Sequence, residues 1–215
     1  DLGPIHAGLV GSSSIAYLTC FFGTVIDGNV AVPIDPQLSA EEIADNLNRA
    51  DVTVLFYDAR FQALADGIRE TCPQIKSCVC FTPGEGRFSL PELLAKECPA
   101  ELRPVEPDQC ACILYTSGTT GKSKGVMLSH RNLIDNATCC DHEGSDADVL
   151  LSVLPIHHAY CLTCDVLLSL RYGATLCLND SPMRLVQNIT LFKPTMLLLV
   201  PLIAETIYRR IMAEK

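Results

Sequence analysis

Strand-like and helix-like segments alternate along the whole chain, and this order limits its fold more than any other feature. Short apolar runs are separated by longer stretches in which apolar side chains recur at helical spacing. The order predicts an α/β fold, with layered sheets and flanking helices that cross over between the strands. The predicted strands are residues 30–34, 52–57, 77–81, 110–115, 126–129, 149–154, 174–178 and 195–199. The predicted helices are residues 13–27, 39–50, 59–71, 91–97, 131–140, 162–171 and 184–192.

A helix start and a linker can be placed within this order. Ser39 lies three residues before Glu42, the spacing of a capping box, and therefore predicts where a helix begins. Three prolines mark a linker near residues 99–107 that joins two halves of the chain. Nothing in the sequence shows that either half closes its own core, so both halves are expected to belong to one domain.

The charge and hydropathy of the chain restrict its partners. The 16 Lys and Arg residues against 25 Asp and Glu residues give a formal net charge of −9, which argues against a nucleic-acid-binding surface. A phosphate-bearing small molecule remains compatible, since backbone N–H groups and one or two lysines can hold it. The longest apolar run, residues 196–204, is about half as long as the ~20 residues of a membrane helix. No transmembrane segment is therefore expected, while peripheral contact with a membrane stays open.

Twelve cysteines occur in the chain, but they form no compact array and no signal-peptide pattern precedes them. We therefore expect a reducing, cytoplasmic environment. Cys78 and Cys80 are two positions apart in a strand-like run, which places both on one face of a strand as small core residues. Cys161 and Cys164 have C-x-x-C spacing, but no second pair follows, so core packing is favoured over a metal or redox site.

A loop rich in glycines, hydroxyl side chains and lysines follows the predicted strand 110–115. Glycines let backbone N–H groups approach phosphate oxygens closely, hydroxyls donate further hydrogen bonds, and lysines neutralise charge. Each hydrogen bond to a charged oxygen contributes about 1.5 to 3 kcal/mol, so a few of them can hold a triphosphate. We therefore predict a triphosphate-binding loop formed by Thr116, Ser117, Gly118, Thr119, Thr120, Gly121, Lys122, Ser123, Lys124 and Gly125.

Two other interpretations fit this loop less well. A flexible linker is disfavoured because such linkers seldom lie between two apolar strands with paired lysines. A Walker A loop follows the rule G-x-x-x-x-G-K-[ST], and Gly121, Lys122 and Ser123 match its end, but Thr116 stands where the rule requires glycine. Residues 126–128 have a strand pattern, whereas a Walker A lysine begins a helix.

The loop and its surroundings resemble a known family. Residues 115–130 resemble the signature loop of the adenylate-forming superfamily, which contains acyl-CoA synthetases, luciferases and peptide-synthetase adenylation domains. One departure is Ser123, where most members of the family carry proline before the lysine. Residues 22–36 and 154–160 are similar to the family's early segment and its acid-pocket motif, and bacterial long-chain acyl-CoA synthetases are the most similar.

The resemblance implies a domain assignment for the whole chain. Residues 1–215 would be an incomplete N-terminal domain of an acyl-CoA synthetase-like fold, with a short portion lost at its start. The family's later motifs, its ribose-binding aspartate and its C-terminal lid domain would lie beyond Lys215. We therefore expect this chain alone to turn over no substrate, although the complete protein would be an enzyme.

The resemblance also implies roles for individual side chains. Lys122 or Lys124 would neutralise phosphate charge, with Lys124 as a catalytic residue, and Thr116 would lie near Mg²⁺. His158 would line the carboxylate site as a catalytic and substrate-binding residue, and Tyr160 would form a pocket wall. The histidines that we interpret as structural are His157 and His130.

The implied reaction is the AMP-forming ligation of an acid to a thiol. A carboxylic acid, in the first place a fatty acid, would attack the α-phosphorus of ATP and expel pyrophosphate, and coenzyme A as co-substrate would then take the acyl group. One alternative is an adenylation domain that passes an amino or aryl acid to a carrier protein. Against amino acids, no acidic residue that could hold an α-amino group follows the acid-pocket motif before Asp165. Another alternative is a nucleotide-binding module without catalysis.

Overall fold

The computed structural model describes residues 4–96, 101–116, 123–139, 143–179 and 181–213. The chain forms two compact units, Asp1–Leu133 and Ile134–Lys215. Over the described residues, the first unit contains a six-stranded sheet and the second a two-stranded sheet. The predicted α/β class is therefore confirmed.

The first unit is built on a sheet with the strand order β4-β3-β1-β2-β5-β6. Strands β1 to β5 run parallel, and β6 pairs antiparallel with β5 at one edge. β1 is central, since it pairs with β2 on one side and with β3 on the other. The strands are β1 (His6–Val10), β2 (Val30–Ile34), β3 (Val54–Tyr57), β4 (Ser77–Cys80), β5 (Cys110–Thr116) and β6 (Lys124–Ser129).

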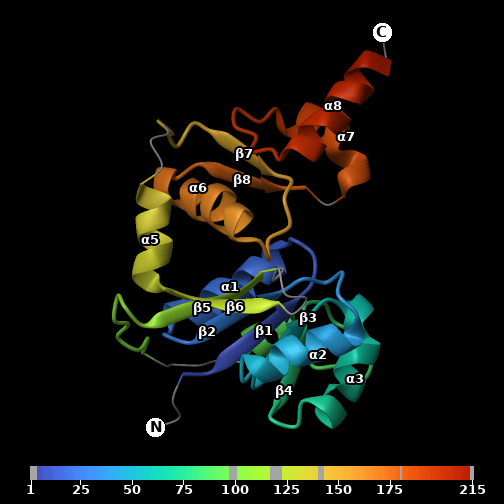
Figure 1. The fold of residues 1–215 in the computed structure, drawn as a ribbon, viewed down its shortest axis with the longest axis vertical. Coiled ribbons are helices and arrows are strands. Elements are labelled where there is room, and N and C mark those ends of the chain that lie inside the picture. The colour runs from blue at the N-terminus through green and yellow to red at the C-terminus, as the bar shows by residue number, and fades with distance from the viewer. Residues whose placement is uncertain (1–3, 97–100, 117–122, 140–142, 180, 214–215) are drawn as a thin grey trace. The chain divides into compact units, whose positions relative to one another are not determined.

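Helices cover both faces of this sheet (Figure 1). α1 connects β1 to β2, whereas α2 leads back past β1 to β3, and α3 continues to β4. Because such crossovers are right-handed, α1 lies on one face, and α2 and α3 lie on the other. The helices are α1 (Ile15–Ile26), α2 (Ala40–Arg49), the short η1 (Ala59–Phe61), α3 (Gln62–Thr71) and α4 (Leu90–Leu94).

The main core of the first unit lies between the sheet and helices α2 and α3. It contains Ile34 and Leu55 from the strands and Ile43, Leu47 and Ile68 from the helices, each at most 1% exposed. Full burial of such a side chain contributes about 1.5 to 3 kcal/mol. The continuously buried central strands, such as β2, and the helical spacing of the buried residues in α2 and α3 therefore fix the layers of this unit.

The first turn of α2 has the capping box that the sequence predicts. The backbone N–H of Ser39 donates to the Glu42 carboxylate at 2.9 Å, and the backbone N–H of Glu42 donates to the Ser39 hydroxyl at 3.3 Å. These bonds satisfy two N–H groups at the end of the helix, so the start of α2 is well defined.

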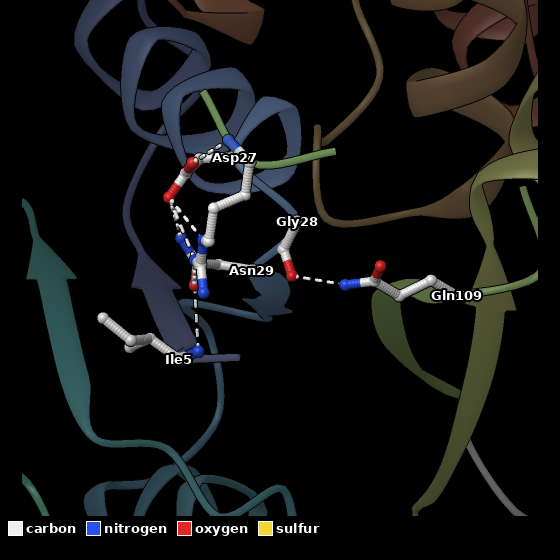
Figure 2. Close-up of polar contacts among 6 residues, drawn as sticks. Ile5, Asp27, Gly28, Asn29 and Gln109 are labelled. Carbon is white, nitrogen blue, oxygen red and sulfur yellow. Dashed lines mark hydrogen bonds and ion pairs between the residues drawn. The ribbon is translucent and has the colours of Figure 1, made fainter. Parts of the chain in front are cut away.

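The coil before β5 forms hydrogen bonds with the turn between α1 and β2 (Figure 2). The side-chain amide of Gln109 donates to the Gly28 carbonyl at 2.6 Å, and the Arg103 guanidinium donates to the Asp27 carboxylate at 2.9 Å. Asn29 accepts a 2.9 Å hydrogen bond from the backbone N–H of Ile5. Gly28 has a φ of +71°, which glycine adopts without strain.

These contacts place the described part of the linker in the first unit. We predict a junction of two halves near residues 99–107, of which 97–100 lie outside the described residues. The division between the compact units falls later, between Leu133 and Ile134. It falls there because β5 and β6, which follow the linker, pair with the sheet of the first unit.

The second unit contains two parallel strands joined by a helical crossover. β7 (Val149–Ser152) pairs in register with β8 (Thr175–Leu178). The crossover begins as a π-helix, η2 (Cys161–Leu167), and continues as α6 (Leu168–Tyr172), which ends at Gly173 in a left-handed conformation. The remaining helices are η3 (Pro182–Arg184), α7 (Leu185–Phe192) and α8 (Pro201–Ala213), while α5 (His130–Thr138) contains the boundary between the units.

Several elements differ from the sequence prediction, and α8 and most of η3 lie outside the predicted helix ranges. β1 was not predicted, although it is the central strand. The predicted strand 195–199 is wrong, because Met196 forms a single bridge with Leu150 before α8 begins at Pro201. The predicted α-helix 162–171 is π-helical over its first part. Within the described residues, none of the helices has the length and apolar character that a membrane span requires.

Candidate functional site

Two residues of the predicted phosphate loop face each other at the end of the β5–β6 hairpin. Thr116, the last residue of β5, pairs with Lys124, the first residue of β6. Residues paired in this way in an antiparallel ladder lie about 5 Å apart, and both side chains here are exposed. A residue with a hydroxyl and a residue with an ammonium group are therefore paired at the end of the hairpin, and both side chains are accessible to an anion.

Residues 117–122, between these two strand ends, are outside the described part of the chain. They include the predicted phosphate-binding residues Ser117, Gly118, Thr119, Thr120, Gly121 and Lys122, whose roles stay predictions. The strand that follows is nonetheless informative, because β6 runs from Lys124 to Ser129 and contains the predicted strand 126–129. A Walker A loop would lead into a helix at this point.

Both strand ends are anchored to the carboxyl end of α2. The Tyr115 hydroxyl donates a 2.7 Å hydrogen bond to the backbone carbonyl of Asn46, and the Ser123 hydroxyl donates a 2.7 Å bond to the Asn46 side chain. Arg49 donates to the Ser123 carbonyl at 2.8 Å, and its guanidinium lies 5.6 Å from the centre of the Tyr115 ring. Sequence analysis missed these anchoring residues, because they lie about 70 positions before the loop.

In the second unit, the predicted acid-pocket residues lie on the turn between β7 and η2. The backbone N–H of His158 donates to the Pro155 carbonyl at 3.1 Å and closes this turn. The rings of His157 and His158 are 4.3 Å apart, with His157 buried and His158 exposed. Tyr160 is 45% exposed. His158 and Tyr160 are thus accessible to a ligand, and their roles stay predictions.

The first residue of η2, Cys161, makes buried contacts with β7 and the turn that follows it. The Cys161 thiol donates to the Leu154 carbonyl at 3.3 Å and lies 3.3 Å from the Ser152 hydroxyl. Burial raises the pKa of the Cys161 thiol to about 12, so it stays protonated at neutral pH. Cys161 is therefore a packed core residue, as its sequence context predicts.

Asp165 is an ionisable residue that sequence analysis did not assign to a site. Its side chain is 1% exposed inside the π-helix η2, and one carboxylate oxygen has no hydrogen-bond partner among the described residues. Burial raises its pKa to about 6, against the opposing effect of hydrogen bonds from Ser152 and Cys161. A lone acid within the apolar run 162–170 was the signal in the sequence. A π-turn often occurs at a functional site, so Asp165 is a candidate residue of this region.

His130 has the structural position that the sequence predicts. It begins α5, and the reciprocal hydrogen bonds between Ser129 and Asn132 cap this helix at 3.0 and 3.2 Å. Burial lowers the pKa of His130, which favours its neutral form.

Comparison with known proteins identifies relatives over most of the chain. The family model described as AMP-binding enzyme matches residues 6–215. A long-chain-fatty-acid–CoA ligase of Thermus thermophilus is 34% identical over 163 residues, which cover 71% of this chain and 29% of the relative. A crotonobetaine/carnitine–CoA ligase of Escherichia coli is 32% identical over 176 residues, which cover 76% of this chain and 34% of the relative. The chain thus spans about a third of the length of these relatives.

Solved structures share the fold. The structure of ATP-bound MatB from Rhodopseudomonas palustris has a TM-score of 0.79 and 27% identity, covering 93% of this chain and 40% of that one. The anthranilate CoA ligase AuaEII in complex with anthranoyl-AMP has a TM-score of 0.82 and 23% identity, covering 90% of this chain and 39% of that one. The second likeness concerns the fold alone.

Proposed function

The chain belongs to the family of AMP-binding enzymes, and from this membership we propose that it forms part of an AMP-forming acid–thiol ligase. In the first step, a carboxylate oxygen attacks the α-phosphorus of ATP, and pyrophosphate leaves with the electrons of the broken P–O bond. In the second step, the thiol of coenzyme A attacks the acyl carbon, AMP leaves, and the thiol proton is released. The products are an acyl thioester, AMP and pyrophosphate.

The observation that carries this proposal is the Thr116–Lys124 pair at the end of the β5–β6 hairpin. Negative charge grows on the leaving pyrophosphate during the first step, and a fixed ammonium group beside it stabilises that charge. Lys124 supplies this group in the proposal. The Thr116 hydroxyl is an exposed oxygen donor of the class that Mg²⁺ accepts, so it would help to hold the ion. When bound, Mg²⁺ would neutralise further phosphate charge.

For the acid, the proposal assigns His158 and Tyr160 to the carboxylate site. Both side chains are accessible on the turn before η2, and an imidazole and a phenol can each donate a hydrogen bond to a carboxylate. We assign a fatty acid as the substrate, supported by the 34% identical relative that is named a long-chain-fatty-acid–CoA ligase. The only carboxylate in the segment 155–165 is Asp165, and its burial leaves nothing there to pair with an α-amino group.

The test is ATP–pyrophosphate exchange by the intact protein with a panel of fatty, aryl and amino acids. We expect exchange that depends on a fatty acid, and transfer of the acyl group to free coenzyme A. Exchange with an amino or aryl acid alone, or transfer only to a carrier protein, would replace the substrate and acceptor assigned above. ATP binding without exchange for any acid would contradict the proposed catalysis.

A further inference from the structure

We propose that Asn46 and Arg49 at the carboxyl end of α2 are positioning residues for the ends of the β5–β6 hairpin. They act through Tyr115 and Ser123, the neighbours of the two residues that would meet the phosphates. The inference rests on the proposed function, because it concerns how Thr116 and Lys124 are held for a nucleotide.

Asn46 contacts both strands of the hairpin. It is a polar residue with only 2% exposure, in a helix whose other buried residues are apolar. Its backbone carbonyl accepts from Tyr115 on β5, and its side-chain oxygen accepts from Ser123 just before β6, both at 2.7 Å. One buried residue of α2 therefore fixes the distance between two strand ends that are eight positions apart in sequence.

Arg49 adds a second connection one helical turn later. Its guanidinium donates to the Ser123 carbonyl at 2.8 Å and lies over the Tyr115 ring, a cation–π arrangement. It is also oriented by Asp45, whose carboxylate lies 3.5 Å away. The two residues of α2 thus reach the same two partners, so each supports the contacts of the other.

The hairpin needs such support because β6 is an edge strand. It pairs only with β5 in the described sheet, and its first four residues are exposed. Packing therefore contributes little to its register, and an edge strand of this kind can slip. Tyr115 directly precedes Thr116 in the chain, and Ser123 directly precedes Lys124. The contacts with α2 therefore hold the strand register next to the two residues that would bind the phosphates.

The experiment measures ATP affinity of the intact protein without acid, and the KM values for ATP and for acid in the exchange reaction. The variants are Asn46→Ala, Ser123→Ala and their combination, together with Arg49→Ala. Ser123→Thr and Arg49→Lys keep a hydroxyl and a positive charge and serve as conservative rescues. Arg69→Ala is the matched control, because Arg69 also donates to a backbone carbonyl, that of Lys76, at 2.9 Å, away from the hairpin.

We expect each alanine variant to bind ATP about three- to tenfold more weakly, with the KM for acid unchanged. The double variant should lose little more than one single variant, since both remove the same hydrogen bond. The rescues should recover most of the affinity, and the control should match the unaltered protein. A general structural defect would instead raise both KM values and lower the unfolding midpoint in step.

The inference is overturned if the unaltered protein binds ATP and the hairpin variants bind it equally well. It is also overturned if the losses in the double variant are additive. An unaltered protein that binds ATP but catalyses no exchange contradicts the proposed function, while the affinities of the variants still decide the role of Asn46 and Arg49. A protein that binds no ATP contradicts both.

Discussion

Gly125 lies directly opposite Tyr115 in the β5–β6 ladder, and a Cβ atom at this glycine would come within 3.4 Å of the tyrosine ring. The same Cβ would lie 3.1 Å from a methyl group of Ile113. The Tyr115 ring therefore packs against Gly125, and its hydroxyl donates a 2.7 Å hydrogen bond to the backbone carbonyl of Asn46. The size of residue 125 thus affects how the end of the hairpin is anchored.

The first prediction concerns this glycine. Gly125→Val places two methyl groups against the Tyr115 ring, and we expect about a tenfold or greater loss of ATP–pyrophosphate exchange. Gly67→Ala is the control, because no atom lies within 4 Å of its Cβ position in α3. That change should stabilise the fold by about 0.5 to 1 kcal/mol and leave exchange unaltered. Full activity of Gly125→Val would show that exchange does not depend on the position of the Tyr115 ring.

The second prediction concerns the Thr116 hydroxyl. Thr116→Ala should raise the Mg²⁺ concentration for half-maximal exchange by about three- to tenfold, because an oxygen donor is lost. Thr116→Ser retains the oxygen and should behave like the unaltered protein. The measurement is a Mg²⁺ titration at saturating ATP and acid. Identical titrations for the alanine and serine variants would remove Thr116 from the metal site.

The third prediction separates the acid site from the nucleotide site. His158→Ala should raise the KM for the acid by about tenfold, the effect of losing one hydrogen bond to a charged group, and should leave the affinity for ATP unchanged. Met183→Ala, at a 79% exposed position of the same unit, is the control and should change neither value. A loss of ATP affinity in His158→Ala would place this histidine at the nucleotide instead.

The fourth prediction is a pH dependence of stability caused by Asp165. Its pKa of about 6 in the folded protein lies above the usual 3.8, so between these values the folded state binds more protons than the unfolded state. The free energy of unfolding therefore falls as the pH rises through this window, by roughly 3 kcal/mol in total. The neutral variant Asp165→Asn should lack this fall. The free energy of unfolding of the variant, minus that of the unaltered protein, should therefore be larger at pH 8 than at pH 4.

Denaturant unfolding at several pH values measures the effect. The comparison is made for the intact protein and for Asp165→Asn at each pH. A difference between the two proteins that does not vary between pH 4 and pH 8 would show that the carboxyl is not held neutral by its burial.

Much of the fold was predictable because it is encoded in local patterns. The buried run at Val30–Ile34 and the Ser39–Glu42 capping box each depend on residues that are close in sequence. β1 escaped prediction because its centre is Gly8, which is unfavourable in an isolated strand. A Cβ at Gly8 would lie 2.6 Å from Leu47, so the glycine is there to let α2 approach the sheet. The close approach of α2 to Gly8 follows from the packing and cannot be predicted from the residues around Gly8.

The candidate site likewise has one part that local sequence predicts and another that only the packing reveals. The chemistry of residues 116–125 is local, and the prediction that they follow one strand and precede another is confirmed by β5 and β6. The anchors Asn46 and Arg49 are distant in sequence and follow no motif, so only the packing of α2 reveals them. The π-helix escaped prediction because an apolar run has the same composition in α- and π-helical form.

The central claim is that Lys124, held opposite Thr116, binds the phosphates of ATP, and titration of the intact protein with ATP tests it most directly. Lys124→Met keeps the length of the side chain and removes the charge, and its unfolding midpoint should stay the same. The account predicts that this variant binds ATP about tenfold or more weakly than the unaltered protein. Equal affinities in the two titrations would contradict it.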